Sequence, residues 1–132
     1  LLMSDLKKNN IKCIKLPVSA PFHCKLMNNA TKVMQNEIAK CDFKNPKNTL
    51  ISNVTSKEVE EASMLKDLLV KQIESRVRWR ENVNLMLERK INNFIEIGPG
   101  KVLSGLIKRI NRDSITSSIN SEDDIKKINI ND

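Results

Sequence analysis

Residues 94–110 read FIEIGPGKVLSGLIKRI, and this stretch decides the fold. Its first residues, FIEI, predict a buried strand, and the Gly-Pro-Gly at 98–100 predicts a tight turn. From residue 101 to residue 110, apolar side chains recur every three or four positions, which predicts a helix with one buried face. A strand that turns directly into a helix is the unit from which parallel α/β sheets are built.

The segments on either side continue this alternation of strands and helices. In chain order the pattern predicts a strand at 11–18, a helix at 25–40 with one buried face, a loop at 42–48, a buried strand at 49–54, helices at 59–74 and 80–91, and a strand at 114–119. Ser121 and the three acidic residues after it predict the start of a last helix. The order of these elements favours an α/β fold with parallel strand pairing.

The glycines at 98–100 also invite comparison with a phosphate-binding loop, because glycines before a helix expose backbone amides to an anion. The spacing fits neither the Walker A pattern nor the dinucleotide-binding pattern. We therefore interpret the segment as a structural turn, with an anion-facing helix terminus as the alternative.

The composition favours some classes of partner over others. A length of 132 residues suits one domain, and the formal charge of +7 would attract anionic partners. The basic residues are dispersed among acidic and apolar ones, and only 3% of the residues are aromatic, so the sequence does not indicate nucleic-acid binding. No apolar run is long enough for a membrane helix, and no signal peptide is visible.

The three cysteines, Cys13, Cys24 and Cys41, form an odd set without the spacing of a zinc site. Free thiols suit a reducing compartment, so we expect a cytoplasmic protein. Cys24 follows His23 directly, and neighbouring side chains on a turn usually point apart, which argues against a Cys-His nucleophile pair. We interpret all three cysteines as small packing residues, and we expect no metal site.

His23 is the chain's one histidine, and it lies between a predicted strand and a predicted helix. Imidazole is the side chain whose ordinary pKa puts its charge change between pH 5 and pH 8, so His23 is the candidate general base. Catalytic groups of α/β enzymes often lie on such turns. The alternative from position alone is a structural or surface histidine.

Four segments together resemble one enzyme family. They are LPVSAPFHCKLM at 16–27, ISNVT at 51–55, LLVKQIESRVRW at 68–79 and FIEIGPGKVLSGLIKRI at 94–110. In this order and roughly this spacing, they resemble the C-terminal half of a malonyl-CoA:acyl carrier protein transacylase, the acyltransferase of fatty acid synthesis. The resemblance covers nearly the whole chain.

The resemblance implies roles for three residues. His23 matches the histidine that activates the family's nucleophilic serine, which is a poor nucleophile until an imidazole takes its proton. Gln72, by the match of VKQI, would orient that histidine through its backbone carbonyl; a solvated helix-end amide is the alternative. Phe22 resembles the aromatic residue that narrows the acyl pocket, with a core anchor for the turn as its alternative. No metal and no permanently bound cofactor is implied, and malonyl-CoA would be the substrate.

The resemblance also implies a fold and a set of partners. The fold would be an α/β-hydrolase-like acyltransferase core, with residues 1–15 ending a ferredoxin-like insert and residues 16–132 supplying the C-terminal part of the core. Acyl carrier protein would be a partner, docking on Lys101, Lys108 and Arg109, with an ordinary solvated helix face as the competing explanation of these residues. We expect cut strands and apolar faces to be exposed.

The chain departs from the family pattern in one decisive way. No G-x-S-x-G occurs in it, so the nucleophile would have to come from a complementary N-terminal half, and we expect the chain alone to be inactive. Arg76 also stands where the family usually has proline. The alternative from another class is a non-enzymatic remnant or a module that binds acyl carrier protein.

Overall fold

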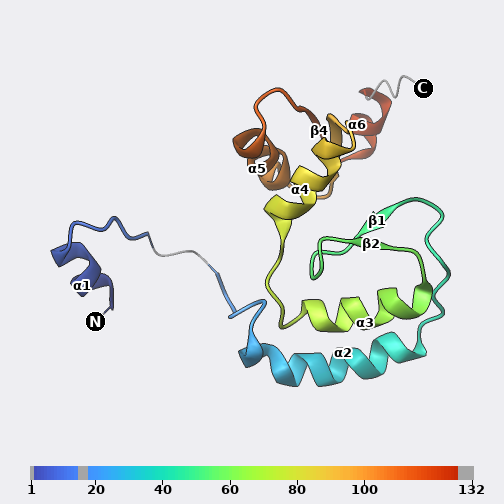
Figure 1. Cartoon of the computed structure of the whole chain (residues 1–132), viewed down its shortest axis with the longest axis horizontal. Coiled ribbons are helices and arrows are strands. Elements are labelled where there is room, and N and C mark those ends of the chain that lie inside the picture. Colours follow the sequence, from blue (N-terminus) through green and yellow to red (C-terminus); the bar gives the residue numbers. More distant parts are fainter. Residues whose placement is uncertain (1, 15–17, 128–132) are drawn as a thin grey trace.

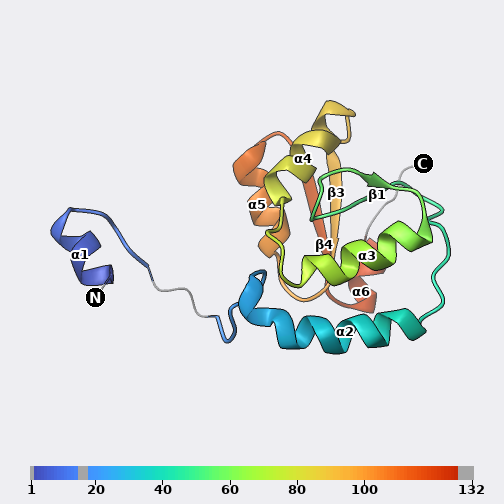
Figure 2. The same cartoon turned by 60° about the horizontal axis from the view of Figure 1, so that its bottom comes forward.

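The computed structural model describes residues 2–14 and 18–127. The elements are α1 (Leu2–Lys8), the 3-10 helix η1 (Lys25–Met27), α2 (Asn28–Lys40), β1 (Leu50–Ile51), β2 (Glu58–Val59), α3 (Ala62–Gln72), α4 (Trp79–Glu88), β3 (Asn93–Ile97), α5 (Val102–Ile110), β4 (Ile115–Ile119) and α6 (Glu122–Lys127). Helix α1 stands apart from the other elements (Figures 1 and 2). These are the α2/α3 helix pair, the β1–β2 hairpin, and the β3–β4 sheet with helices α4, α5 and α6.

Residues 94–110 form the expected strand, turn and helix. Strand β3 pairs in parallel with β4, and α5 connects them and packs on both. The predicted turn is confirmed. Gly98 and Gly100 have φ angles of +134° and +97°, which L-residues rarely adopt, and this explains why glycine stands at both positions. Helix α4 packs on α5, and the core between them holds Val83, Phe94 and Ile107.

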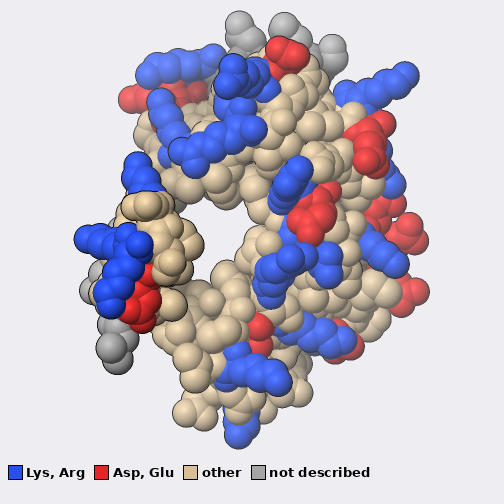
Figure 3. Space-filling model, turned by 60° about the vertical axis from the view of Figure 1, so that its left-hand side comes forward, with Lys and Arg blue, Asp and Glu red and all other residues tan. Residues whose placement is uncertain are grey.

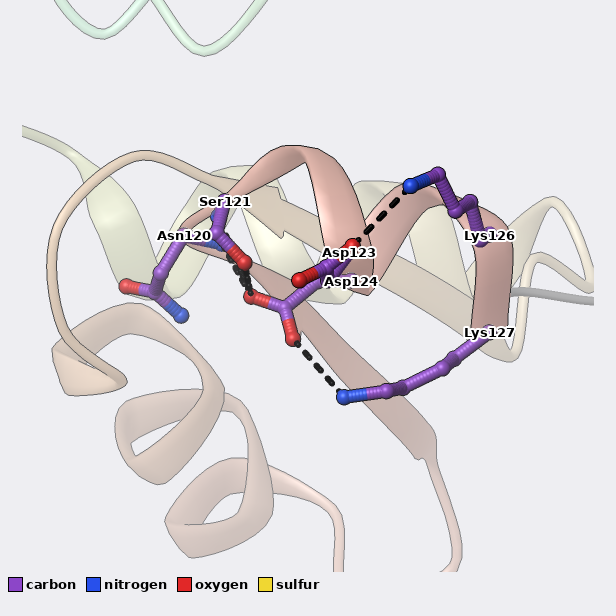
Figure 4. Close-up of polar contacts among 6 residues, drawn as sticks. All are labelled: Asn120, Ser121, Asp123, Asp124, Lys126 and Lys127. Atoms are coloured by element: carbon purple, nitrogen blue, oxygen red, sulfur yellow. Dashed lines mark hydrogen bonds and ion pairs between the residues drawn. The ribbon is translucent and has the colours of Figure 1, made fainter.

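Helix α6 begins where the sequence predicted, and its cap is a carboxylate (Figure 4). Asp124 Oδ2 accepts hydrogen bonds from the backbone N–H groups of Asn120 (3.0 Å) and Ser121 (3.1 Å) and from the Ser121 hydroxyl (3.0 Å). The bond from the Asn120 amide is the largest cause that lowers the pKa of Asp124, followed by the Ser121 hydroxyl. The acidic first turn thus satisfies amides that a helix start leaves without partners.

Helices α2 and α3 lie side by side and run in opposite directions (Figure 1). At one end of the pair, Lys66 Nζ donates to the Ala39 carbonyl at 3.3 Å. The helix predicted at 25–40 is confirmed, beginning with the η1 turn, but the expectation of a buried face is wrong. No residue of α2 is buried, and Val33 and Met34 are exposed, because no described element covers the side of α2 that faces away from α3.

The predicted strand at 49–54 is shorter than expected, and the start predicted for the next helix is wrong. Strand β1 pairs with β2 in an antiparallel hairpin, so Val59 is a strand residue and is only 2% exposed. Helix α3 begins at Ala62, whose N–H donates to the Asn45 side chain at 2.9 Å. The Asn45 side chain, from the loop before β1, therefore binds the first amide of α3, at a boundary that apolar spacing alone placed three residues early.

The strand predicted at 11–18 is wrong for the residues that the structure describes. Residues 11–14 and Val18 are irregular, and residues 15–17 lie outside the described part. A strand needs the backbone of a neighbour, and no described segment pairs with this one. The ferredoxin-like assignment of residues 1–15, of which 1 and 15 are not described, stays a prediction.

The surface of the described chain carries many apolar side chains. Leu26 and Ile97 are 79% and 80% exposed, and Phe22 and Val102 are also mostly exposed. The three cysteines are free; Cys13 and Cys24 are partly buried, whereas Cys41 is exposed, so the packing interpretation is wrong for Cys41. Among the described helices, none has the length and apolar character needed to cross a membrane.

Candidate active site

His23 lies on the turn that leads into η1. Its φ is +61°, the left-handed conformation, which costs a residue other than glycine about 1 kcal/mol or more. The turn is closed by a bond from the Phe22 N–H to the Ala20 carbonyl (2.9 Å) and by the Cys24 thiol, which donates to the Pro21 carbonyl at 3.1 Å. These bonds hold the imidazole at the start of the α2 segment.

The structure brings His23 and Gln72 together although 49 residues separate them. Gln72 is the last residue of α3, and its carbonyl is among those that a helix end leaves without an intrahelical partner. His23 Nδ1 lies 2.9 Å from this carbonyl oxygen. A carbonyl oxygen only accepts, so Nδ1 carries the proton in this bond and the neutral ring keeps its lone pair on Nε2.

An apolar groove of about 550 Å³ runs from His23 along the α2/α3 pair. Most of its lining comes from α2 and the turn before it, and the rest comes from the end of α3: Phe22, His23, Met27, Ala30, Met34, Ile38, Leu69, Gln72 and Ile73. Phe22 is 57% exposed beside the imidazole, so the described residues do not bury it as a core anchor, and its role in the acyl pocket stays a prediction. An imidazole with a free nitrogen at the mouth of an apolar groove can take a proton from a group bound there.

The Gly98 turn does not offer an anion site, because a carboxylate of the protein already fills it. Glu96 Oε1 accepts from the Leu103 N–H at 3.0 Å, and Oε2 accepts from the Ser104 N–H at 2.8 Å. These two amides in the first turn of α5 are therefore already hydrogen-bonded to Glu96. A phosphate there would meet a negative charge, so the structural interpretation of the turn holds and the anion-facing alternative does not.

The structure separates the basic residues suggested for carrier docking. Lys101 precedes α5, whereas Lys108 and Arg109 lie in its last turn, about 10 Å further along the axis. Lys108 Nζ donates to the Arg112 carbonyl at 3.0 Å, which engages it at the helix end. Figure 3 shows one face of the molecule, on which some basic side chains lie beside acidic ones and others lie beside one another.

Two arginines shortly before Trp79 are paired within the protein. Arg76 forms an ion pair with Glu81 at 3.0 Å, and Arg78 shares the same carboxylate at 3.5 Å. Arg78 Nε also donates to the Val54 carbonyl at 3.0 Å. The loop that carries Arg76 is thus held by charge pairing and a backbone contact. Among the described residues, no cluster of three or more His, Cys, Asp or Glu side chains forms a metal site.

Sequence reasoning missed a second contact beside the histidine. Asn28 Nδ2 donates to Glu74 Oε1 at 3.1 Å, and this bond joins the first residue of α2 to the turn just after Gln72. No motif or periodicity marks either residue. The two segments meet only when α2 and α3 pack, so no local signal in the sequence indicates the pair.

Comparisons with known proteins extend over nearly the whole chain. No family model matches it. The chain is 39% identical over 127 residues to the malonyl CoA-acyl carrier protein transacylase of Bacillus subtilis, which covers 95% of this chain and 40% of that protein. The solved malonyl CoA-acyl carrier protein transacylase of Coxiella burnetii is 36% identical with a TM-score of 0.84, over 95% of this chain and 40% of that one.

A further similar structure contains a type II PKS acyl-carrier protein in complex with its malonyl-transacylase, with a TM-score of 0.81, 31% identity, and coverage of 94% of this chain and 40% of that one. The chain thus spans about 40% of the length of the relatives it matches. The hydrolase-like acyltransferase core expected from the motifs fits these structures. By sequence and by fold, this chain resembles one part of a malonyl CoA-acyl carrier protein transacylase, as its four motifs indicated.

Proposed function

We propose that this chain is the C-terminal part of a malonyl-CoA:acyl carrier protein transacylase and that His23 is the general base of its serine-histidine dyad. The observation that carries the proposal is the 2.9 Å bond from His23 Nδ1 to the Gln72 carbonyl. This bond holds the ring by one nitrogen and leaves the other with a lone pair, which is what a base for a serine hydroxyl requires.

The reaction has two matched halves. In the first, Nε2 of His23 takes the serine proton while the serine oxygen attacks the malonyl thioester carbon; the carbon–sulfur bond then breaks, and the coenzyme A sulfur leaves with the proton from the imidazolium. In the second, Nε2 takes the proton of the carrier's thiol, the sulfur attacks the malonyl ester, and the serine oxygen recovers its proton. No electrons are exchanged, and the chemistry requires no resident cofactor.

The serine belongs to a part of the acyltransferase fold that this chain does not contain, since no G-x-S-x-G occurs in it. The exposed apolar surface supports the idea that this other part covers α2 and the groove. Helix α2 buries no residue, and the groove beside His23 is lined almost entirely by apolar side chains. Large exposed apolar faces of this kind mark sites of contact with other protein surfaces.

Finer assignments of the acyl pocket, the acceptor, the donor and the location accompany this proposal. Phe22, which lines the groove beside His23, narrows the acyl site against branched acyl groups. Acyl carrier protein is the acceptor, approaching through Lys101, Lys108 and Arg109; the similar transacylase solved with its acyl-carrier protein supports such a partner. Malonyl-CoA is the donor, and the cytoplasm is the expected location.

Reconstitution tests the function. The chain is mixed with the part of the Bacillus subtilis relative that it does not match, and transfer of labelled malonyl from coenzyme A to acyl carrier protein is measured. We expect transfer from the mixture, none from either piece, and loss of transfer with His23→Ala but not with Cys41→Ala, since Cys41 lies exposed beyond the end of α2.

Two outcomes contradict the proposal. A covalent malonyl adduct on the chain alone would mean that it carries its own nucleophile. A mixture that associates but transfers nothing would favour the alternative, a remnant or carrier-binding module, and binding of acyl carrier protein to the chain alone would then decide between these two.

A further inference from the structure

A second hydrogen bond crosses the junction at which His23 meets Gln72. Asn28 lies five residues after His23, and Glu74 lies two residues after Gln72. The Asn28 side chain donates to Glu74 Oε1 at 3.1 Å. The two bonds thus join the same pair of segments, the turn that enters α2 and the turn that leaves α3.

Several groups of the α2 segment act on the Glu74 carboxylate. The Thr31 hydroxyl, one turn further along the helix, is the largest cause that lowers the pKa of Glu74, although its own hydrogen bond goes to the Met27 carbonyl at 3.2 Å. The Asn28 amide is the next cause, and the charges of Lys25 and Lys32 act in the same direction, against a partial burial that raises the pKa. Glu74 is therefore ionised at neutral pH, the state that accepts hydrogen bonds most strongly.

The turn that carries Glu74 is rigidly tied to Gln72. The Ser75 N–H bonds the Lys71 carbonyl at 3.0 Å, and the Glu74 N–H bonds the same carbonyl at 3.3 Å. Any shift of Glu74 relative to α2 therefore moves the Gln72 carbonyl as well. Glu74 itself is not among the residues that line the groove, so it acts on His23 only through this backbone.

We propose that Glu74 is a positioning residue, which holds the first turn of α2 against the end of α3 and thereby keeps the Gln72 carbonyl on Nδ1 of His23. The bond between the His23 ring nitrogen and the Gln72 carbonyl fixes one point of contact between the two segments. The second bond, from Asn28 to Glu74, adds another contact at the same end of the helix pair and so restrains rotation about the first. The importance of this alignment for acyl transfer rests on the proposed function, whereas the alignment itself does not.

The chain's single histidine makes the proposal measurable without any activity. Nitrogen-15 NMR of the imidazole in the labelled 132-residue chain, at a pH where the ring is neutral, reports the ratio of Nδ1–H to Nε2–H tautomers of His23 alone. In the unmodified chain we expect Nδ1–H to dominate. With Glu74→Ala we expect that ratio to fall about fivefold, the factor that one net hydrogen bond supplies.

Two further variants separate positioning from general destabilisation. Glu74→Gln keeps an oxygen that accepts from Asn28, so we expect it to restore the ratio. Lys66→Met removes the bond to the Ala39 carbonyl at the opposite end of the same helix pair, so we expect it to lower stability and leave the ratio unchanged.

An unchanged ratio in Glu74→Ala, or an equal fall in Lys66→Met, overturns the proposal. So does a dominant Nε2–H form in the unmodified chain. If circular dichroism shows that Glu74→Ala is unfolded, Asn28→Ala, which removes the donor of the same hydrogen bond, decides in its place, and we expect the ratio to fall in this variant too. Failure of acyl transfer in the reconstituted enzyme, with the tautomer changes as expected, would count against the proposed function and not against this positioning role.

Discussion

The carboxylate of Glu96 forms two hydrogen bonds with Ser104: its Oε2 accepts from the Ser104 N–H at 2.8 Å and from the Ser104 hydroxyl at 2.7 Å. Glu96 lies on β3, so a strand residue caps the helix that follows the turn. The residue at the local cap position, Lys101, makes no side-chain cap bond. The cap therefore depends on the strand and the helix being packed together, and it couples the two elements of the unit.

We expect this cap to make stability depend on pH. The Ser104 hydroxyl is the largest cause that lowers the pKa of Glu96, followed by the Ser104 N–H. Since the pKa is lower in the folded state, the contribution to stability is full above the unfolded pKa and is lost as pH falls through the folded one. Urea unfolding of Glu96→Gln should show a lower midpoint than the unmodified chain at pH 7, and the difference should shrink below pH 4. A difference between the two urea midpoints that stays the same at pH 7 and below pH 4 would contradict this role of Glu96.

Replacing glycine by alanine should have opposite effects at Gly98 and Gly105. Gly98 has a φ of +134°, so Gly98→Ala should lower stability by about 1 to 3 kcal/mol although the space around it is open. Gly105 lies within α5 with nothing near its missing Cβ, so Gly105→Ala should raise stability by about 0.5 to 1 kcal/mol. Thermal unfolding measures both changes, and two changes of the same sign would contradict this prediction.

The small core at Val83 should be sensitive to the loss of two methyl groups. Val83 is fully buried against Phe94 and Ile107. We expect Val83→Ala to lower the free energy of unfolding by about 2 kcal/mol, because it removes apolar contact and leaves a cavity. Val33→Ala is the matched control: Val33 is 62% exposed, and alanine is the better helix former, so stability should not fall. Equal losses in denaturant unfolding would mean that Val83 is not in a packed core.

Phe22 should control acyl selectivity in the reconstituted enzyme. Phe22→Ala opens the groove beside His23, so the ratio of methylmalonyl to malonyl transfer should rise by about tenfold, the scale on which a pocket distinguishes one methyl group. Competition between the two labelled donors measures this ratio. Met34→Ala, further along the groove, serves as the control and should change the ratio less. A ratio that does not change in Phe22→Ala would remove Phe22 from the acyl site.

Charge at α5 should influence the approach of acyl carrier protein. If the basic residues of α5 attract the proposed carrier electrostatically, Arg109→Glu should slow its association at low ionic strength, and the effect should fade as salt is added. Lys108→Glu would also break the bond to the Arg112 carbonyl, so Arg109 is the cleaner test. Stopped-flow titration at two salt concentrations gives the rates, and identical rates for both forms would exclude this surface as the docking site.

Local patterns predicted the elements that depend on neighbouring residues. Apolar spacing indicated α2, α4 and α5, and two glycines marked the turn after β3. The register of apolar side chains along a helix or strand is set by residue order, so it can be read without knowing what packs on it. The same logic failed at Val59, where the pairing of β2 with β1 overrode a helical pattern.

Residue order therefore indicates most of the helical segments of this chain, the turn that needs glycine and the one histidine that could serve as a base. It does not settle that the Gln72 carbonyl meets His23, that Glu74 meets Asn28, or that Glu96 caps α5. Family resemblance suggested the first of these contacts, and nothing in the spacing suggested the other two. Such bonds join groups that come within hydrogen-bonding distance only after helices and strands have packed, so their geometry belongs to the assembled fold.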